Sequence, residues 1–60
     1  MGKYEIIFDF DDGWTTEFAL SEIFEGTWTE LQEYLKQMKK WGCYNISASL
    51  LYEYEIVLNG

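Results

Sequence analysis

The chain has 60 residues, of which 48% are hydrophobic, and its net charge of −7 gives a pI near 4.1. This length allows one domain, residues 1–60, and the apolar fraction excludes a disordered chain. The acidity opposes direct binding to nucleic acid or anionic lipid, and we expect neither, because both require lysine and arginine to neutralise phosphate. No apolar run is long enough to span a membrane, and the lone cysteine forms no internal disulfide, which favours a reducing cytoplasm.

Residues 3–10 alternate between apolar and polar side chains, which is the period of a half-buried strand. Residues 14–20 alternate in the same way and predict a second strand. The turn sequence Asp11-Asp12-Gly13 lies between them and predicts a hairpin. The matching apolar faces carry Tyr4, Ile6, Phe8 and Phe10 on the first strand and Trp14, Thr16, Phe18 and Leu20 on the second.

The register of this hairpin follows from its faces. A three-residue loop, residues 11–13, keeps the faces consistent and places Gly13 at the left-handed position of the turn. A two-residue loop would put the Glu17 carboxylate opposite Phe8, on the apolar face. We therefore predict the cross-strand pairs Phe10–Trp14, Phe8–Thr16, Ile6–Phe18 and Tyr4–Leu20.

Residues 21–26 predict a connection in which Ile23 and Phe24 cover one end of the core. Thr27 and Glu30 then form a capping-box signature, which predicts that a helix begins there. Gly42 is the residue expected just beyond the end of that helix. The predicted buried stripe consists of Trp28, Leu31, Leu35 and Met38.

Residues 45–57 alternate again and predict a long final strand. A right-handed crossover through the helix lets the first strand lie between the other two, antiparallel to both. The predicted fold is therefore an α+β domain of ββαβ type, a three-stranded antiparallel sheet in the order 2-1-3 with one helix packed on one face. The face predicted for Ile46 carries Ala48, Leu50, Tyr52, Tyr54 and Ile56 as well.

The sequence has no catalytic, metal-binding or cofactor-binding signature, and we expect no enzyme. The chain lacks histidine, so Cys43 has no imidazole base, and a small apolar residue near the helix end is the favoured interpretation over a reactive thiol. Asp9, Asp11 and Asp12 precede a glycine as in a calcium loop. The required ligand spacing and the late glutamate are missing, which favours a simple turn.

Carboxylates gather on the predicted sheet face that turns away from the helix. They are Glu5, Asp9, Glu17, Glu53 and Glu55, flanked at the turn by Asp11 and Asp12, with Ile7, Leu51 and Val57 on the same face. An apolar centre inside an acidic rim is typical of a protein interface and predicts a basic partner, such as a nuclease or other nucleic-acid-binding protein. A purely solubilising surface would carry similar charge. A homodimer through this face, or through the edge of the final strand, is a further alternative.

Tyr34 and Trp41 lie seven residues apart and are offset from the predicted buried stripe. Packing over the margin of the core is the favoured interpretation, and an exposed binding hot spot is the alternative.

In size, acidity and lack of catalytic groups, the chain resembles small phage-encoded inhibitor proteins of the anti-CRISPR and DNA-mimic types. The resemblance implies a protein that acts in the host cytoplasm by binding a nuclease or another nucleic-acid-binding protein. A structural or assembly protein that forms homo-oligomers is the first alternative. A designed domain with no function beyond folding is the second, although Cys43 and the apolar residues on the open face fit it poorly.

Overall fold

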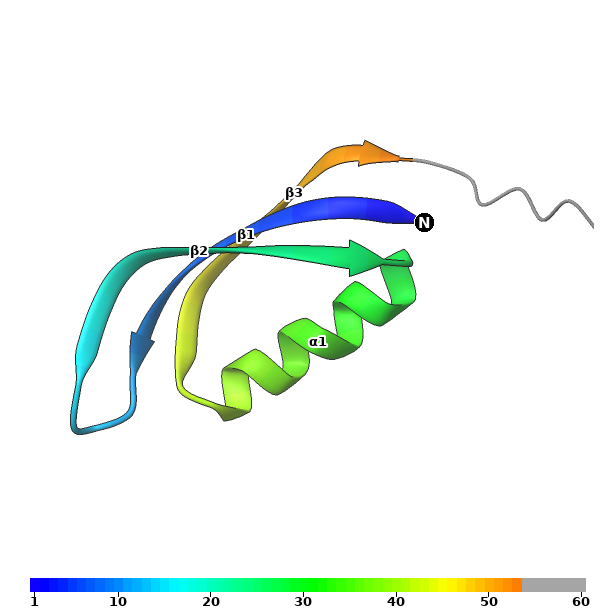
Figure 1. Ribbon diagram of the computed structural model, residues 1–60. Helices are drawn as coiled ribbons and strands as arrows, with labels where there is room; N and C mark the ends of the chain where they lie inside the picture. Colours follow the sequence, from blue (N-terminus) through cyan, green and yellow to red (C-terminus); the bar gives the residue numbers. More distant parts are fainter. Residues whose placement is uncertain (54–60) are drawn as a thin grey trace, which may run out of the picture.

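A computed structural model of the chain describes residues 1–53, which form three strands and one helix (Figure 1). The elements are β1 (Gly2–Asp11), β2 (Thr16–Gly26), α1 (Trp28–Lys40) and β3 (Cys43–Glu53). The sheet is antiparallel with the order β2-β1-β3, and α1 lies against one of its faces. The predicted α+β fold, its ββαβ element order and its strand order are confirmed.

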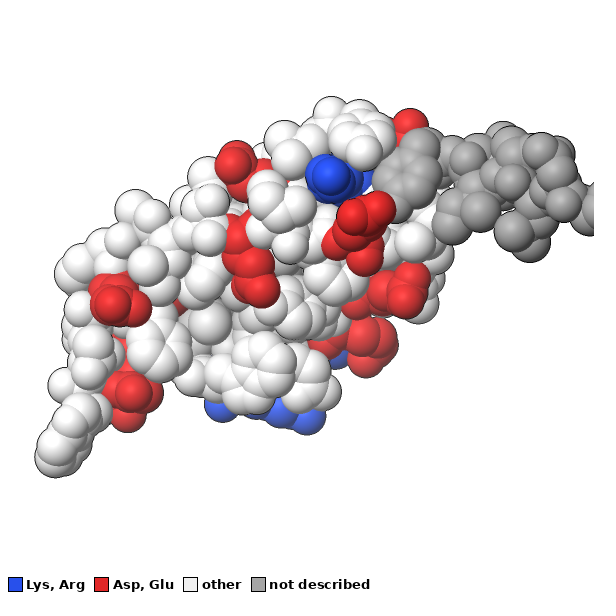
Figure 2. Space-filling view, in the orientation of Figure 1, with Lys and Arg blue, Asp and Glu red and all other residues white. Residues whose placement is uncertain are grey.

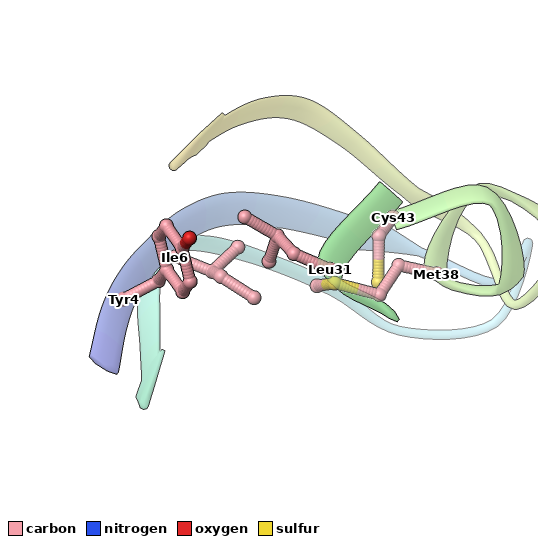
Figure 3. Close-up of a cluster of buried hydrophobic side chains, with 5 residues drawn as sticks. All are labelled: Tyr4, Ile6, Leu31, Met38 and Cys43. Carbon is pink, nitrogen blue, oxygen red and sulfur yellow. The ribbon is translucent and has the colours of Figure 1, made fainter. Parts of the chain in front are cut away.

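The core lies between α1 and the face of β1 that carries Tyr4 and Ile6 (Figure 3). Ile6 and Leu31 are 0% exposed, and Met38 and Cys43 close the core at the end where α1 finishes. Alternation along β1 sends every second side chain toward α1, as the sequence period predicts. The described residues contain no helix that is long and apolar enough to cross a membrane.

The predicted capping box is confirmed at the start of α1. The Thr27 hydroxyl accepts a hydrogen bond from the Glu30 backbone N–H at 3.1 Å, and the Glu30 carboxylate accepts one from the Thr27 backbone N–H at 2.9 Å. These two bonds satisfy donors that the first helical turn leaves without partners. At the other end, Gly42 has a φ of 104°, which an L side chain rarely adopts, so glycine stands where the chain leaves the helix.

The predicted hairpin register is wrong. Asp11 pairs with Thr16 and Phe10 pairs with Glu17, so the loop contains the four residues 12–15 rather than three. The Asp12 backbone N–H donates to the Thr15 carbonyl at 3.3 Å inside this loop. The three-residue loop keeps the apolar side chains on one face only if the second strand has no bulge.

That bulge lies in β2 opposite Asp9. Phe10 pairs with Glu17 while Phe8 pairs with Leu20, so β2 contains one extra residue between these pairs. Ala19 in the bulge has a φ of 55°. An extra residue in a strand changes which of its side chains point to each face of the sheet. Phe18, predicted to pair with Ile6, is therefore 68% exposed.

Beyond the bulge, β2 continues through the segment predicted as a connection. Tyr4 pairs with Phe24, and Gly2 pairs with Gly26. Phe24 therefore packs on the core margin, where its ring stacks on Tyr34 with centroids 5.0 Å apart. Ile23, predicted to cover the core with Phe24, lies on the opposite face and is exposed.

β3 begins at Cys43, two residues earlier than predicted, and carries two bulges of its own. The first falls opposite Phe8, where Asn45 has a φ of 50°, and the second places Leu51 between the residues that pair with Tyr4 and Lys3. The second bulge moves Tyr52 to the open face, opposite Lys3, which corrects its predicted place beside Ile46 and Leu50. The predicted continuation of this strand to Val57 lies outside the described residues.

Candidate functional site

The hairpin tip presents a tryptophan on a tightly hydrogen-bonded loop. The Asp12 carboxylate accepts hydrogen bonds from the backbone N–H groups of Trp14 at 2.8 Å and Thr15 at 2.7 Å. The Asp11 carboxylate accepts one from the Gly13 N–H at 2.8 Å. These bonds order the backbone, yet Trp14 itself is 95% exposed. The tip therefore offers a large apolar ring on a loop that loses little freedom on binding.

Asp9 of β1 connects the bulges of both neighbouring strands. Its Oδ1 accepts a hydrogen bond from the Ala19 backbone N–H at 2.9 Å, and its Oδ2 accepts one from the Asn45 side-chain amide at 3.0 Å. Ala19 and Asn45 both have positive φ, a region that is unfavourable for L residues. One carboxylate therefore stabilises both bulges. The Ala19 hydrogen bond, and then that of Asn45, lower the pKa of Asp9 below its usual value.

Replacing Asp9 with asparagine is expected to lower the stability of the fold at neutral pH. It should also make stability depend less steeply on pH in the acidic range. A carboxyl whose pKa is lower in the folded state stabilises the fold above its unfolded pKa of about 4, and this contribution disappears as the pH falls further. Asparagine can still accept from Ala19, but its amide N–H₂ cannot accept from Asn45. Melting temperatures between about pH 6 and about pH 2 measure the effect.

Glu17→Gln is the matched control. Glu17 also lies beside the β2 bulge, but the hydrogen bonds from Ala19 and Asn45 go to Asp9 and not to Glu17. Equal melting curves for Asp9→Asn and the unchanged protein across the acidic range would contradict the role of Asp9.

The structure brings together only part of the predicted acidic face. Glu5, Ile7 and Asp9 lie on the face of β1 that turns away from α1, as predicted. Glu17 and Glu53 do not join them, because their pairing places both on the helix side of the sheet. The four-residue hairpin loop causes the first error, because it pairs Glu17 with Phe10. The bulge at Leu51 causes the second, because it adds a residue that the alternation of the sequence does not show.

The turn residues of the predicted face act as local acceptors. Asp11 and Asp12 bind backbone N–H groups of their own loop, and Asp9 binds the two bulges. The bonds to Thr15 and then Trp14 lower the pKa of Asp12. No three acidic, cysteine or histidine residues within residues 1–53 are placed to hold a metal ion. Predicted Glu55 lies outside the described residues, as does Val57.

The open face is mixed rather than uniformly acidic. Glu5 is flanked by Ile23 on β2 and Ser49 on β3, and in the next row Lys3 lies between Glu25 and Tyr52. The Lys3 ammonium lies 5.5 Å from the centre of the Tyr52 ring, within range of a cation–π interaction. On the side of the molecule that Figure 2 shows, most acidic groups are separated by uncharged atoms.

Exposed apolar side chains beyond the predicted Ile7 and Leu51 are the feature that the sequence interpretation missed. Those of the described residues are Met1, Ile7, Trp14, Phe18, Ile23, Trp28, Trp41, Tyr44, Leu50, Leu51 and Tyr52. Predicted Leu51 belongs to this set through its place in a bulge. Single exposed apolar residues are ordinary on a protein surface, whereas contiguous patches of them are typical of binding sites.

The aromatic residues of the helix are divided between core margin and surface. Tyr34 is half-buried, and its hydroxyl donates to the Glu22 carboxylate, which raises the pKa of Tyr34 to about 12. Trp41 packs edge-on to Tyr34 with ring centroids 6.1 Å apart and remains exposed. Packing over the core margin is therefore confirmed for Tyr34, whereas Trp41 contacts Tyr34 and is itself 57% exposed. Trp28, predicted to be buried, is 61% exposed, with its ring centroid 6.1 Å from that of the core residue Tyr4.

Cys43 lies in the core beside Met38, and burial raises the pKa of its thiol. This position agrees with a small apolar residue at the start of β3. The part of the chain that the structure describes encloses no pocket.

No family model, curated protein or solved structure matches the chain.

Proposed function

We propose that the chain is a non-enzymatic protein-binding module whose partner carries an apolar pocket within a basic surface. Trp14 carries the proposal: it is 95% exposed, yet three carboxylate hydrogen bonds order the loop that presents it. Tryptophan is enriched among the residues that dominate binding energy, and an ordered loop retains most of that energy.

The charge of the chain defines the partner further. A net charge of −7 speeds association with a basic protein and opposes association with acidic ones. A groove that normally holds nucleic acid combines basic residues with stacking surfaces for bases, and an indole ring suits such a surface. The partner class is therefore a nuclease or another nucleic-acid-binding protein, in agreement with the resemblance to phage-encoded inhibitors. The proposal places the chain in the cytoplasm of the host cell.

Trp14→Ala is expected to weaken binding to such a partner by about 30-fold or more, because truncating a hot-spot residue costs about 2 kcal/mol or more. The immobilised chain would capture proteins from a bacterial lysate at low salt, and the partner, once identified by mass spectrometry, would be titrated against both chains. The melting temperature should not change, because the loop bonds of Trp14 use only its backbone.

Salt and a second variant separate the two parts of this proposal. The affinity should fall as ionic strength rises, since exposed charges are screened within about 8 Å at physiological salt. Glu5→Gln should slow association without changing the Trp14 effect. A partner that is bound equally well by Trp14→Ala, or whose affinity is independent of salt, would refute the proposal.

A further inference from the structure

The two edges of the sheet differ in charge. Edge strand β2 carries Glu17, Glu22 and Glu25, whereas the chain has no charged residue between Lys40 and Glu53. That uncharged run spans β3 except for its last residue. Exposed strand edges usually carry charges because their free backbone groups can pair with another chain. β3 is thus the edge of the sheet on which an acidic chain meets least repulsion.

The sequence of β3 is nearly palindromic about Ala48. On either side of it lie Ser47 and Ser49, then Ile46 and Leu50, and at greater distance Tyr44 and Tyr52. Antiparallel pairing of two identical strands across a two-fold axis at residue 48 would place each residue opposite its palindromic partner. Serine would then lie opposite serine, isoleucine opposite leucine, and tyrosine opposite tyrosine.

The two bulges of β3 preserve this symmetry. Their extra residues, Asn45 and Leu51, each lie three positions from Ala48. Pairing with β1 places Tyr44 opposite Asp9 and Tyr52 opposite Lys3, so both tyrosines lie on the open face despite the bulges. Residues that would lie opposite each other across the two-fold axis are therefore on the same face of the sheet. Contact between side chains of neighbouring strands requires this.

The helix side of β3 is also incompletely covered. Leu50 pairs with Tyr4, which is 8% exposed, yet Leu50 itself is 52% exposed. A helix about 10 Å wide covers roughly two strands spaced about 4.8 Å apart, so one helix leaves part of a three-stranded sheet open. Figure 1 shows this end of β3 lying away from α1.

We propose that β3 pairs antiparallel with β3 of a second copy of this chain, about a two-fold axis at Ala48. The result is a continuous sheet with both helices on one side, in which Ile46 of each copy meets Leu50 of the other. The apolar strip at Ala48 and Leu50 then lies beneath the seam between the two helices. This dimer is separate from the partner surface at Trp14, which lies on the hairpin at the other end of the molecule from Leu50.

The chain offers a matched pair of variants. Ser47 and Ser21 lie on opposite edge strands, both pair with Ile7, and both are exposed. Ser47→Lys should weaken self-association at least about tenfold, because a charge at a strand edge opposes pairing. Ser21→Lys should not weaken it. Each variant reduces the net charge to −6 (−7 + 1), so overall repulsion falls equally in both.

Sedimentation equilibrium from micromolar to millimolar concentration measures the result. The unchanged chain should pass from 7.2 kDa toward 14.4 kDa (2 × 7.2), and salt should strengthen the dimer because it screens repulsion between two acidic chains. Binding of a basic partner has the opposite salt dependence, so the two proposals fail independently. A chain that stays at 7.2 kDa throughout, or equal weakening by both variants, would overturn the dimer.

A cysteine at the axis tests the register. Ala48→Cys should form a disulfide-linked dimer under mild oxidation, because directly opposite residues have Cβ atoms about 5 Å apart. Ser47→Cys should link poorly, since residue 47 of one copy lies diagonal to residue 47 of the other at about 7 Å. Circular dichroism confirms that both variants fold. Preferential linkage at residue 47 would overturn the axis at Ala48.

Discussion

Replacing Leu31 with alanine is expected to remove most of the free energy that stabilises the folded chain. Leu31 is 0% exposed and lies at the middle of the core, between the β1 residues and Met38 (Figure 3). Truncating a buried leucine costs about 2–5 kcal/mol, since the cavity refills only partly. A core of this size rarely provides more than about 3–5 kcal/mol of net stability, so the change removes most of it.

Urea unfolding followed by far-ultraviolet circular dichroism measures the loss, with melting temperature as a second readout. Leu51→Ala is the matched control, because it makes the same truncation at an exposed position and should cost well under 1 kcal/mol in the monomer. Leu31→Met should restore most of the stability, because it conserves volume in the core. Cooperative folding of Leu31→Ala with unchanged stability would show that the core lies elsewhere.

The elements that the sequence predicted correctly are those set by local physics. The alternation of β1 and the Thr27–Glu30 capping box each depend on residues a few positions apart, and both appear in the structure as expected. The strand order follows from the connections, because a helix between two strands restricts how the chain can return to the sheet. Element types and topology were therefore predictable without any knowledge of the side-chain contacts.

The register and the acidic face were not predictable, because they depend on contacts between distant residues. Asp9 binds Ala19 ten positions away and Asn45 36 positions away, and both partners adopt positive φ. A period of two carries no sign of such an extra residue, and each bulge moves the following side chains to the other face. The bulge at Leu51 moved Glu53 off the predicted face in this way, and the four-residue hairpin loop moved Glu17.

Two signals in the sequence did bear on the two surfaces proposed to bind. Two aspartates before a glycine can each accept bonds from the following backbone N–H groups, which extends the turn and leaves Trp14 at its tip. The palindrome about Ala48 was also readable, but its significance depends on β3 being an edge strand. Topology therefore had to be known before that pattern could suggest a symmetric contact.

Replacing Gly42 with alanine is expected to destabilise the fold by at least about 2 kcal/mol. The backbone φ of 104° is unfavourable for any L side chain, and a Cβ at this position would lie 2.6 Å from the Asp11 carbonyl oxygen. The backbone cannot move away freely, because the Asp11 N–H donates to the Gly42 carbonyl at 3.0 Å. That bond joins the end of β1 to the chain just before β3.

Gly13→Ala separates the two causes. Gly13 also has a positive φ, of 82°, but a Cβ there would meet no atom within 4 Å. Alanine at residue 13 should therefore cost only the backbone term, about 1 kcal/mol, whereas alanine at residue 42 adds the overlap with Asp11. Chemical denaturation of both variants measures the difference. Equal decreases in the free energy of unfolding would mean that the contact between residue 42 and β1 relaxes at no cost. A larger decrease at residue 42 means that glycine is required there for two reasons: it ends α1, and it lets β3 start against β1.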